Sequence, residues 1–76
     1  MNTLLMQFKP RDRRMMLKIL QQARDYGEVV AVSDSIDWCM TELVKIGALE
    51  KISDRAIFVC HITDIGRDQL FYRGDE

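Results

Sequence analysis

The feature that most constrains this chain is the stretch of residues 42–70, ELVKIGALEKISDRAIFVCHITDIGRDQL. It predicts the end of a helix, then a β-hairpin over residues 49–62, then the start of another helix. Gly47 can adopt the left-handed backbone conformation that closes a helix without a steric penalty. Residues 56–62 are mostly β-branched and aromatic, which is typical of a strand, and Thr63 is expected to cap the next helix. The chain should therefore fold back as a paired ribbon between two helices.

Residues 11–26 have the pattern of an amphipathic helix. Apolar residues recur there at i, i+3, i+4 and i+7, namely Met16, Ile19, Leu20 and Ala23. Gly27 follows and is expected to end this helix. The valine-rich residues 28–32 are too short for a helix, so they predict a strand. That strand could pair with the hairpin and give a three-stranded sheet.

A second amphipathic helix is expected over residues 33–46, with Ser33 or Asp34 as its N-cap. Its apolar stripe consists of Ile36, Cys39, Met40 and Leu43. A last helix is predicted over residues 64–73. Three aromatic residues are assigned to the core or its rim, namely Tyr26, Phe71 and Tyr72.

These elements define an α+β fold class. The prediction is a small domain of three helices with a two- to three-stranded antiparallel sheet, in the order α-β-α-β-β-α. The 76 residues are enough for one small domain, so residues 1–76 are assigned to a single unit. Residues 1–9 are read as an arm that either covers the core or contacts a second copy, and residues 74–76 as a polar tail.

The composition limits the function classes. With 11 basic and 12 acidic residues the formal net charge is −1, which argues against a protein that holds nucleic acid by bulk charge but leaves room for a local basic face. Cys39 and Cys60 are not part of a Cys-x-x-Cys motif and are expected to be reduced and buried. No targeting segment and no apolar run long enough to span a bilayer is found, so a cytoplasmic location is expected.

Two motifs within residues 42–70 carry a family resemblance. LVKIGALEK, at the end of the second helix, and ITDIGRDQL, at the entry to the last helix, are separated by a gap of hairpin size. In this order they resemble the second half of a winged-helix domain, over the chain from Ser33 onward. The resemblance implies a compact DNA-binding transcription regulator of the kind found in bacteria and their phages, usually a homodimer.

The chain departs from that family in one respect. A DNA-binding winged helix has two helices between its first strand and its wing, and the second of them reads the major groove. Between Gly27 and Gly47 this chain has room for a strand and one good helix only. It therefore resembles a degenerate winged helix that lacks one helix of the helix-turn-helix.

The helix in the reading position is acidic. It carries Asp34, Asp37 and Glu42 against the single cation Lys45, whereas a helix that reads bases is expected to be rich in Arg, Lys, Asn or Gln. Trp38 lies off the centre of its apolar stripe. Trp38 can pack at the edge of the core, or it can anchor a protein partner, because aromatic residues surrounded by polar ones recur at binding hot spots.

Most of the basic residues lie elsewhere. Five of them are concentrated at the start of the first helix, namely Lys9, Arg11, Arg13, Arg14 and Lys18, with only Asp12 opposing them. This cluster can be a solvated helix face, a patch that contacts phosphates, or a docking site for an acidic protein. Arg55 is predicted at the tip of the wing.

No constellation of catalytic residues is found. His61 is the only histidine, and within a strand it points away from its neighbour Cys60, so an ordinary strand histidine is expected. The chain has no Gly-rich phosphate loop and no convincing acid pair. We therefore expect no enzyme activity, no cofactor, no metal and no small-molecule substrate.

Two hypotheses of function remain. In the first, the chain is a winged-helix DNA-binding regulator: Arg11, Arg13, Arg14 and Lys18 contact phosphates, Arg55 reaches a minor groove and Lys45 lies near the major groove. In the second, it is a winged-helix protein-interaction module, an adaptor or inhibitor that docks through Asp34, Asp37, Trp38 and Glu42. Double-stranded DNA or a protein is thus the expected partner, with a homodimer possible.

Overall fold

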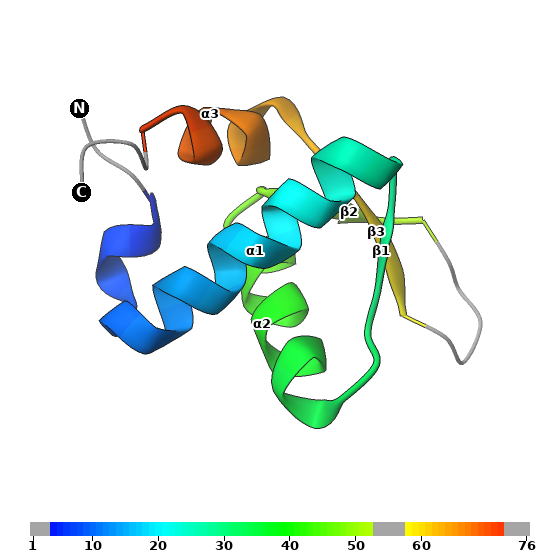
Figure 1. Cartoon of the computed structure of the whole chain (residues 1–76), viewed down its shortest axis with the longest axis horizontal. Helices are drawn as coiled ribbons and strands as arrows, with labels where there is room; N and C mark the ends of the chain where they lie inside the picture. Colours follow the sequence, from blue (N-terminus) through cyan, green and yellow to red (C-terminus); the bar gives the residue numbers. More distant parts are fainter. Residues whose placement is uncertain (1–3, 53–57, 73–76) are drawn as a thin grey trace.

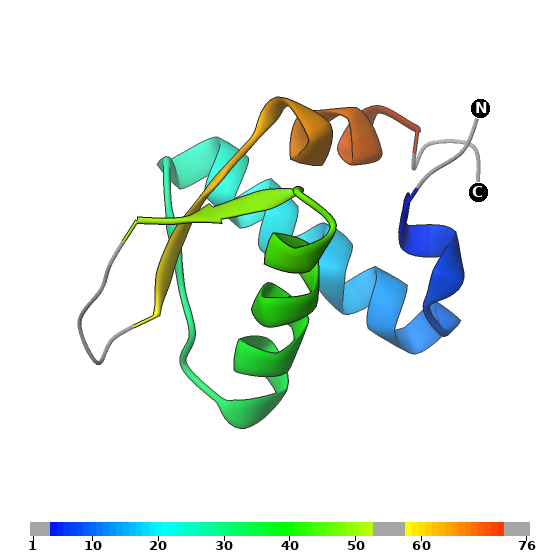
Figure 2. The same ribbon diagram turned by 180° about the vertical axis from the view of Figure 1, so that it is seen from behind.

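The computed structural model describes residues 4–52 and 58–72. The elements follow one another as a short 3₁₀ helix η1 (Leu4–Gln7), α1 (Pro10–Tyr26), β1 (Val29–Val30), α2 (Asp34–Lys45), β2 (Leu49–Lys51), β3 (Val59–Ile62) and α3 (Asp64–Tyr72). This confirms the α+β class and the order α-β-α-β-β-α. Figures 1 and 2, which view the chain from opposite sides, show α1 on one side of the molecule and α2 with β2 on the other.

Helix α1 packs against α2, α3, β1, β3 and η1. Its first residue is Pro10, whose fixed φ suits the first turn and whose missing N–H is not needed there. The predicted stripe of Met16, Ile19, Leu20 and Ala23 is buried throughout. Gly27 ends the helix with φ of 87°, and its N–H donates to the Ala23 carbonyl at 2.9 Å, as the sequence predicts.

Helix α2 is closed at both ends by local interactions. The Ser33 side-chain oxygen accepts a hydrogen bond from the Ile36 N–H at 3.2 Å, so Ser33 is the N-cap. At the other end Gly47 has φ of 85°, and the Ala48 N–H donates to the Leu43 carbonyl at 2.8 Å. Residues Cys39, Met40 and Leu43 of the predicted stripe are buried.

The sheet has the order β1-β3-β2, and both pairs are antiparallel. Residue Glu50 lies opposite His61 in the hairpin register, and Val29 lies opposite Cys60 across the other pair. The three-stranded sheet is thus confirmed, although its strands are shorter than predicted. The predicted polar turn at residues 53–55, which includes Arg55, lies outside the described residues.

The inner face of helix α3 consists of Gly66, Gln69 and Leu70. Phe71 is 81% exposed, so its assignment to the core or rim is wrong. Gln69, only 4% exposed, takes an inner position because its amide is satisfied: its oxygen accepts from the Leu4 N–H at 2.8 Å and its nitrogen donates to the Ile65 carbonyl at 3.3 Å.

Tyr26 is the second aromatic residue whose assignment to the core or rim is wrong, since it is 80% exposed. It is the last residue of α1 and lies one turn beyond the buried Ala23. The Tyr72 side chain lies outside the described residues. Leu5 in η1 is buried, so the described part of the arm does cover the core.

Candidate functional site

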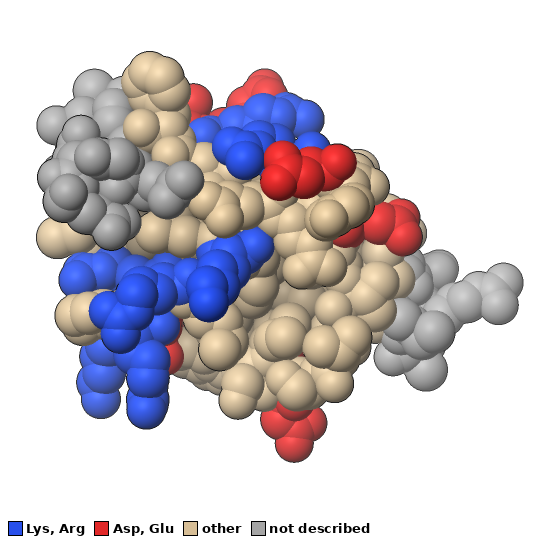
Figure 3. Space-filling view, in the orientation of Figure 1, with Lys and Arg blue, Asp and Glu red and all other residues tan. Residues whose placement is uncertain are grey.

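The five predicted cations at the start of α1 lie together on the surface. We call Lys9, Arg11, Arg13, Arg14 and Lys18 the basic cluster. Figure 3 shows blue side chains gathered over the beginning of α1, at the left of the molecule. Arg11, Arg14 and Lys18 recur at i, i+3 and i+7, so they share one exposed stripe of the helix. Arg13 is half-buried and donates to the Met6 sulfur at 3.6 Å.

The basic cluster differs from the other described cations in its pairing. Arg24 pairs with Asp25 at 3.0 Å, Lys45 with Glu42 at 3.2 Å and Arg67 with Asp64 at 3.1 Å. Lys51 lies over the Phe58 ring, with its Nζ 5.5 Å from the centroid. Within residues 4–52 and 58–72, by contrast, no member of the basic cluster forms an ion pair. Within these ranges its positive charge is therefore not neutralised by a carboxylate.

Helix α2 presents the opposite charge. Asp34 and Asp37 are exposed in its first turn, Glu42 is half-buried, and Lys45 is held by Glu42. The Thr41 hydroxyl donates to the Asp37 carbonyl at 2.9 Å and so binds its own helix. The structure therefore leaves this surface acidic, as the sequence indicates.

The predicted DNA-contacting residues do not all come together. Arg11, Arg13, Arg14 and Lys18 lie on one element, whereas Lys45 lies at the end of α2 in an ion pair. The described hairpin strands β2 and β3 extend toward the end of the molecule opposite the start of α1 (Figures 1 and 2). The described part of the hairpin and the basic cluster therefore do not form one continuous surface.

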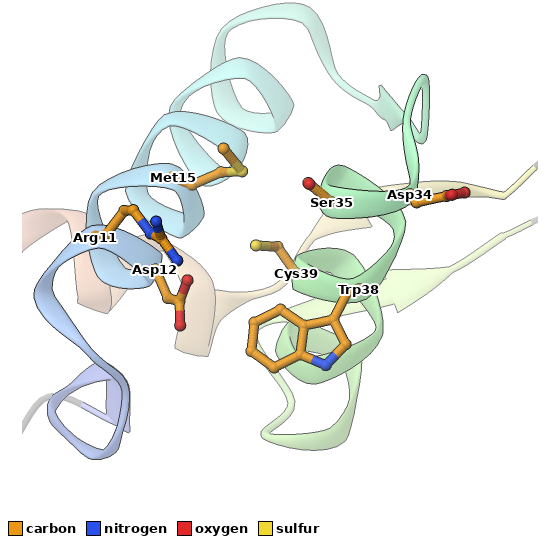
Figure 4. Close-up of a pocket in the computed structure, with 7 residues that line it drawn as sticks. All are labelled: Arg11, Asp12, Met15, Asp34, Ser35, Trp38 and Cys39. Atoms are coloured by element: carbon orange, nitrogen blue, oxygen red, sulfur yellow. The ribbon is translucent and has the colours of Figure 1, made fainter.

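A cleft of about 560 Å³ opens between the starts of α1 and α2. We call it the Trp38 cleft; it is lined by Arg11, Asp12, Met15, Asp34, Ser35, Trp38 and Cys39. In Figure 4, Arg11, Asp12 and Met15 come from α1 and face Ser35, Trp38 and Cys39 across the opening, while Asp34 points away from its centre.

Trp38 is 46% exposed at the edge of this cleft. Its ring meets the Phe8 ring edge to face, with centroids 6.3 Å apart and planes at 83°. Trp38 therefore packs on Phe8 at the edge of the core, while nearly half of its surface stays exposed. Sequence reasoning missed Phe8 as the ring partner of Trp38 and Met15 as a residue that lines the cleft, although Met15 follows Arg11 by one helical turn and shares its stripe.

The two thiols are buried, and the histidine lies in a cross-strand contact. Cys39 and Cys60 are both free and buried, which confirms that prediction. Burial raises the pKa of Cys39, and the carboxylates of Asp12 and Glu42 raise it further. Burial also raises the pKa of Cys60 to about 11, against a smaller opposing effect of Lys51. The His61 Nε2 lies 2.7 Å from the Glu50 Oε1, across the strand pair.

Within the described ranges, no group of three or more His, Cys, Asp or Glu side chains is arranged to hold a metal ion. Nor does any helix in that part of the chain have the length and apolar character needed to cross a bilayer. Comparison with known proteins adds no assignment: no family model matches the chain, and neither a curated protein nor a solved structure matches it significantly.

Proposed function

We propose that this protein is a winged-helix DNA-binding regulator that contacts the phosphates of double-stranded DNA through the basic cluster. The element order and the hairpin between α2 and α3 support the resemblance to a winged helix. The observation that carries the proposal is the difference in ion pairing between the basic cluster and the other described cations. Among the residues that the structure describes, the cations of the basic cluster have no carboxylate partner, whereas Arg24, Lys45 and Arg67 each pair with a carboxylate.

The charge distribution determines which element faces DNA. Asp34 and Asp37 on α2 would be repelled by phosphates, so α2 does not enter the major groove in this proposal. The stripe of Arg11, Arg14 and Lys18 instead lies along the backbone, where contacts orient a protein but carry no base information. Sequence selectivity then has to come from DNA shape or from another segment.

The proposal is tested by measuring the binding of the chain to a short labelled duplex at several salt concentrations. Binding is expected at low ionic strength and should weaken steeply with added salt, because each phosphate contact releases condensed counterions. The Arg67→Gln variant, which removes a paired cation on α3, is a matched control and should bind like the wild type. Absence of binding at low ionic strength would overturn the proposal.

A second candidate function rests on a different observation. Trp38 is about half exposed, contacts the Phe8 ring and lies on the acidic helix α2. In this alternative the chain is a protein-interaction module that docks through Asp34, Asp37, Trp38 and Glu42. Replacing Trp38 and Glu42 by alanine should then abolish capture of a partner while the fold persists and any DNA binding is unchanged. Undiminished capture by that variant would count against the alternative.

A further inference from the structure

The Trp38 cleft connects the basic cluster to an exposed aromatic side chain. Arg11 belongs to both, since it begins the stripe that continues with Arg14 and Lys18 and it also lines the cleft. Trp38 lies across the opening from it, on α2 (Figure 4). Trp38 is 46% exposed although the Phe8 ring packs on it. A row of phosphates that follows the stripe therefore reaches the mouth of the cleft, where an aromatic ring is exposed.

The lining of the cleft combines an apolar centre with polar groups around it, as is typical of small-ligand sites. Its volume of about 560 Å³ lies within the usual range of roughly 300–1,000 Å³ for such sites. The centre is formed by Trp38 and by Met15, which is 37% exposed. The α1 side offers a cation and a carboxylate together, because Arg11 and Asp12 are consecutive residues that both line the opening. The ligand that fits has a flat ring, a negative group and a hydrogen-bond donor.

We propose that the Trp38 cleft receives one unpaired base of a DNA strand whose phosphates lie on the basic cluster. This inference rests on the proposed function and names the form of DNA that the site prefers, a duplex with a single-stranded end. The base stacks on the Trp38 ring, since every base has a π-face that packs on an aromatic side chain. Arg11 binds the phosphate of that nucleotide through charge-assisted hydrogen bonds. Asp12 accepts a hydrogen bond from the exocyclic amino group of a base such as cytosine.

The charges around the cleft determine on which side the DNA backbone lies. Asp34 points away from the centre of the cleft, and both Asp34 and Asp37 are exposed in the first turn of α2. These carboxylates repel phosphates, so the backbone lies over α1 and the base reaches across toward α2. A base that is paired within a duplex has to be extruded from the stack before it can do so. The site therefore selects a base that is already unpaired, such as one in an overhang.

The test compares the affinity of the chain for labelled duplexes with the same paired segment. One duplex is blunt, one carries a short cytosine overhang in either polarity, and one carries the same overhang with abasic sites. The abasic overhang is the matched probe, because it keeps the phosphates and removes only the ring that stacks. In one polarity the cytosine overhang should bind about tenfold more tightly than the blunt and abasic probes, an effect typical of one stacked base.

A thymine overhang tests the role of Asp12. Thymine has no exocyclic amino group for the carboxylate, so this overhang should bind less tightly than the cytosine overhang. Equal affinity for the two overhangs would exclude the proposed contact of Asp12.

Variants of Trp38 separate stacking from charge. The quantity to compare is the ratio of the affinities for the cytosine overhang and the blunt duplex, measured for each protein. Trp38→Leu should lose this gain and Trp38→Tyr should keep most of it, because tyrosine retains a ring that can stack. Tyr26→Ser removes an exposed ring at the other end of α1 and should leave the gain unchanged. Trp38 is the only tryptophan, so the cytosine overhang should quench the emission of the wild type and the abasic overhang should not.

The inference is overturned if the cytosine and abasic overhangs bind equally, if Trp38→Leu keeps the gain, or if the Trp38 emission does not respond to the base. In that case a blunt duplex that still binds with a steep salt dependence leaves the phosphate contacts standing, and the Trp38 surface is left to the protein-docking alternative. If the blunt duplex does not bind but the cytosine overhang binds through Trp38, the proposed duplex-binding regulator is wrong and the base site stands.

Discussion

The Phe8 and Trp38 rings form an edge-to-face pair with centroids 6.3 Å apart, which ties the segment before α1 to the exposed side of α2. Aromatic pairs of this geometry contribute about 0.5–1.5 kcal/mol beyond the area they bury. Phe8→Leu should therefore lower the free energy of unfolding by about 1 kcal/mol. It should also shift the emission of Trp38 to longer wavelength, because the ring loses a partner. Tyr26→Ser at the exposed end of α1 is the control, and unchanged emission in Phe8→Leu would show that the pair does not form.

Gly66 lies where α3 approaches the turn after α2. A Cβ atom built on it would lie 2.2 Å from the Ala48 carbonyl oxygen and 2.8 Å from the Ile62 Cγ1. Gly66→Ala should therefore displace α3 and lower the free energy of unfolding by about 3 kcal/mol, at the upper end for overpacked sites. Gly27 has open space around it but a positive φ, so Gly27→Ala should cost only about 1 kcal/mol. Equal losses in urea unfolding at the two positions would contradict this account of Gly66.

The Thr63 hydroxyl connects three segments. It donates to the Gly47 carbonyl and accepts from the Gly66 N–H at 3.1 Å, so it caps α3 and ties that cap to the end of α2. Thr63→Val keeps the shape but removes both hydrogen bonds, and it should lower the free energy of unfolding by about 1–2 kcal/mol. Thr63→Ser retains the hydroxyl and should lose much less. A serine variant as unstable as the valine variant would show that the hydroxyl is not the stabilising group.

Because the pKa of the Cys60 thiol is raised, we expect the free energy of unfolding to fall at high pH. Burial raises the pKa of its thiol from 9.0 to about 11, so between these values the unfolded chain loses this proton while the folded chain keeps it. Stability contributed by the neutral thiol is thus complete below pH 9 and is lost as the pH rises toward 11. The free energy of unfolding should fall more steeply over this range for the wild type than for Cys60→Ala. Parallel slopes for the two proteins would contradict the raised pKa.

The parts of the fold that could be predicted from sequence are those marked by apolar residues at regular spacing or by a glycine where the backbone needs a positive φ. The α1 stripe of Met16, Ile19, Leu20 and Ala23 is apolar at helical spacing, and Gly27 has the positive φ that glycine favours. The inner face of α3 could not be found this way. Two of its three residues, Gly66 and Gln69, carry no hydrophobic signal. Gly66 is selected by a backbone contact and Gln69 by a hydrogen bond to Leu4, which is 65 residues away in sequence.

The candidate site was also predicted only in part. The basic cluster is local in sequence, so its members could be grouped before the fold was known. The lack of ion pairs to it among the described residues depends on which carboxylates the fold brings near, and the order of residues does not reveal this. The same holds for the Trp38 cleft, because the packing of α1 on α2 brings Met15 and Trp38 to one opening and no motif links them.

The most direct test of the central claim, that the basic cluster contacts phosphates, is the salt dependence of DNA binding when Arg14 and Lys18 are neutralised. Logarithmic plots of the association constant against salt concentration should be compared for the wild type, Arg14→Gln/Lys18→Gln and the control Arg67→Gln. If both residues contact phosphates, the slope of the double variant should be smaller in magnitude by about 2, close to one per lost contact. A double variant with the wild-type slope would contradict the claim, as would an Arg67→Gln slope reduced to the same extent.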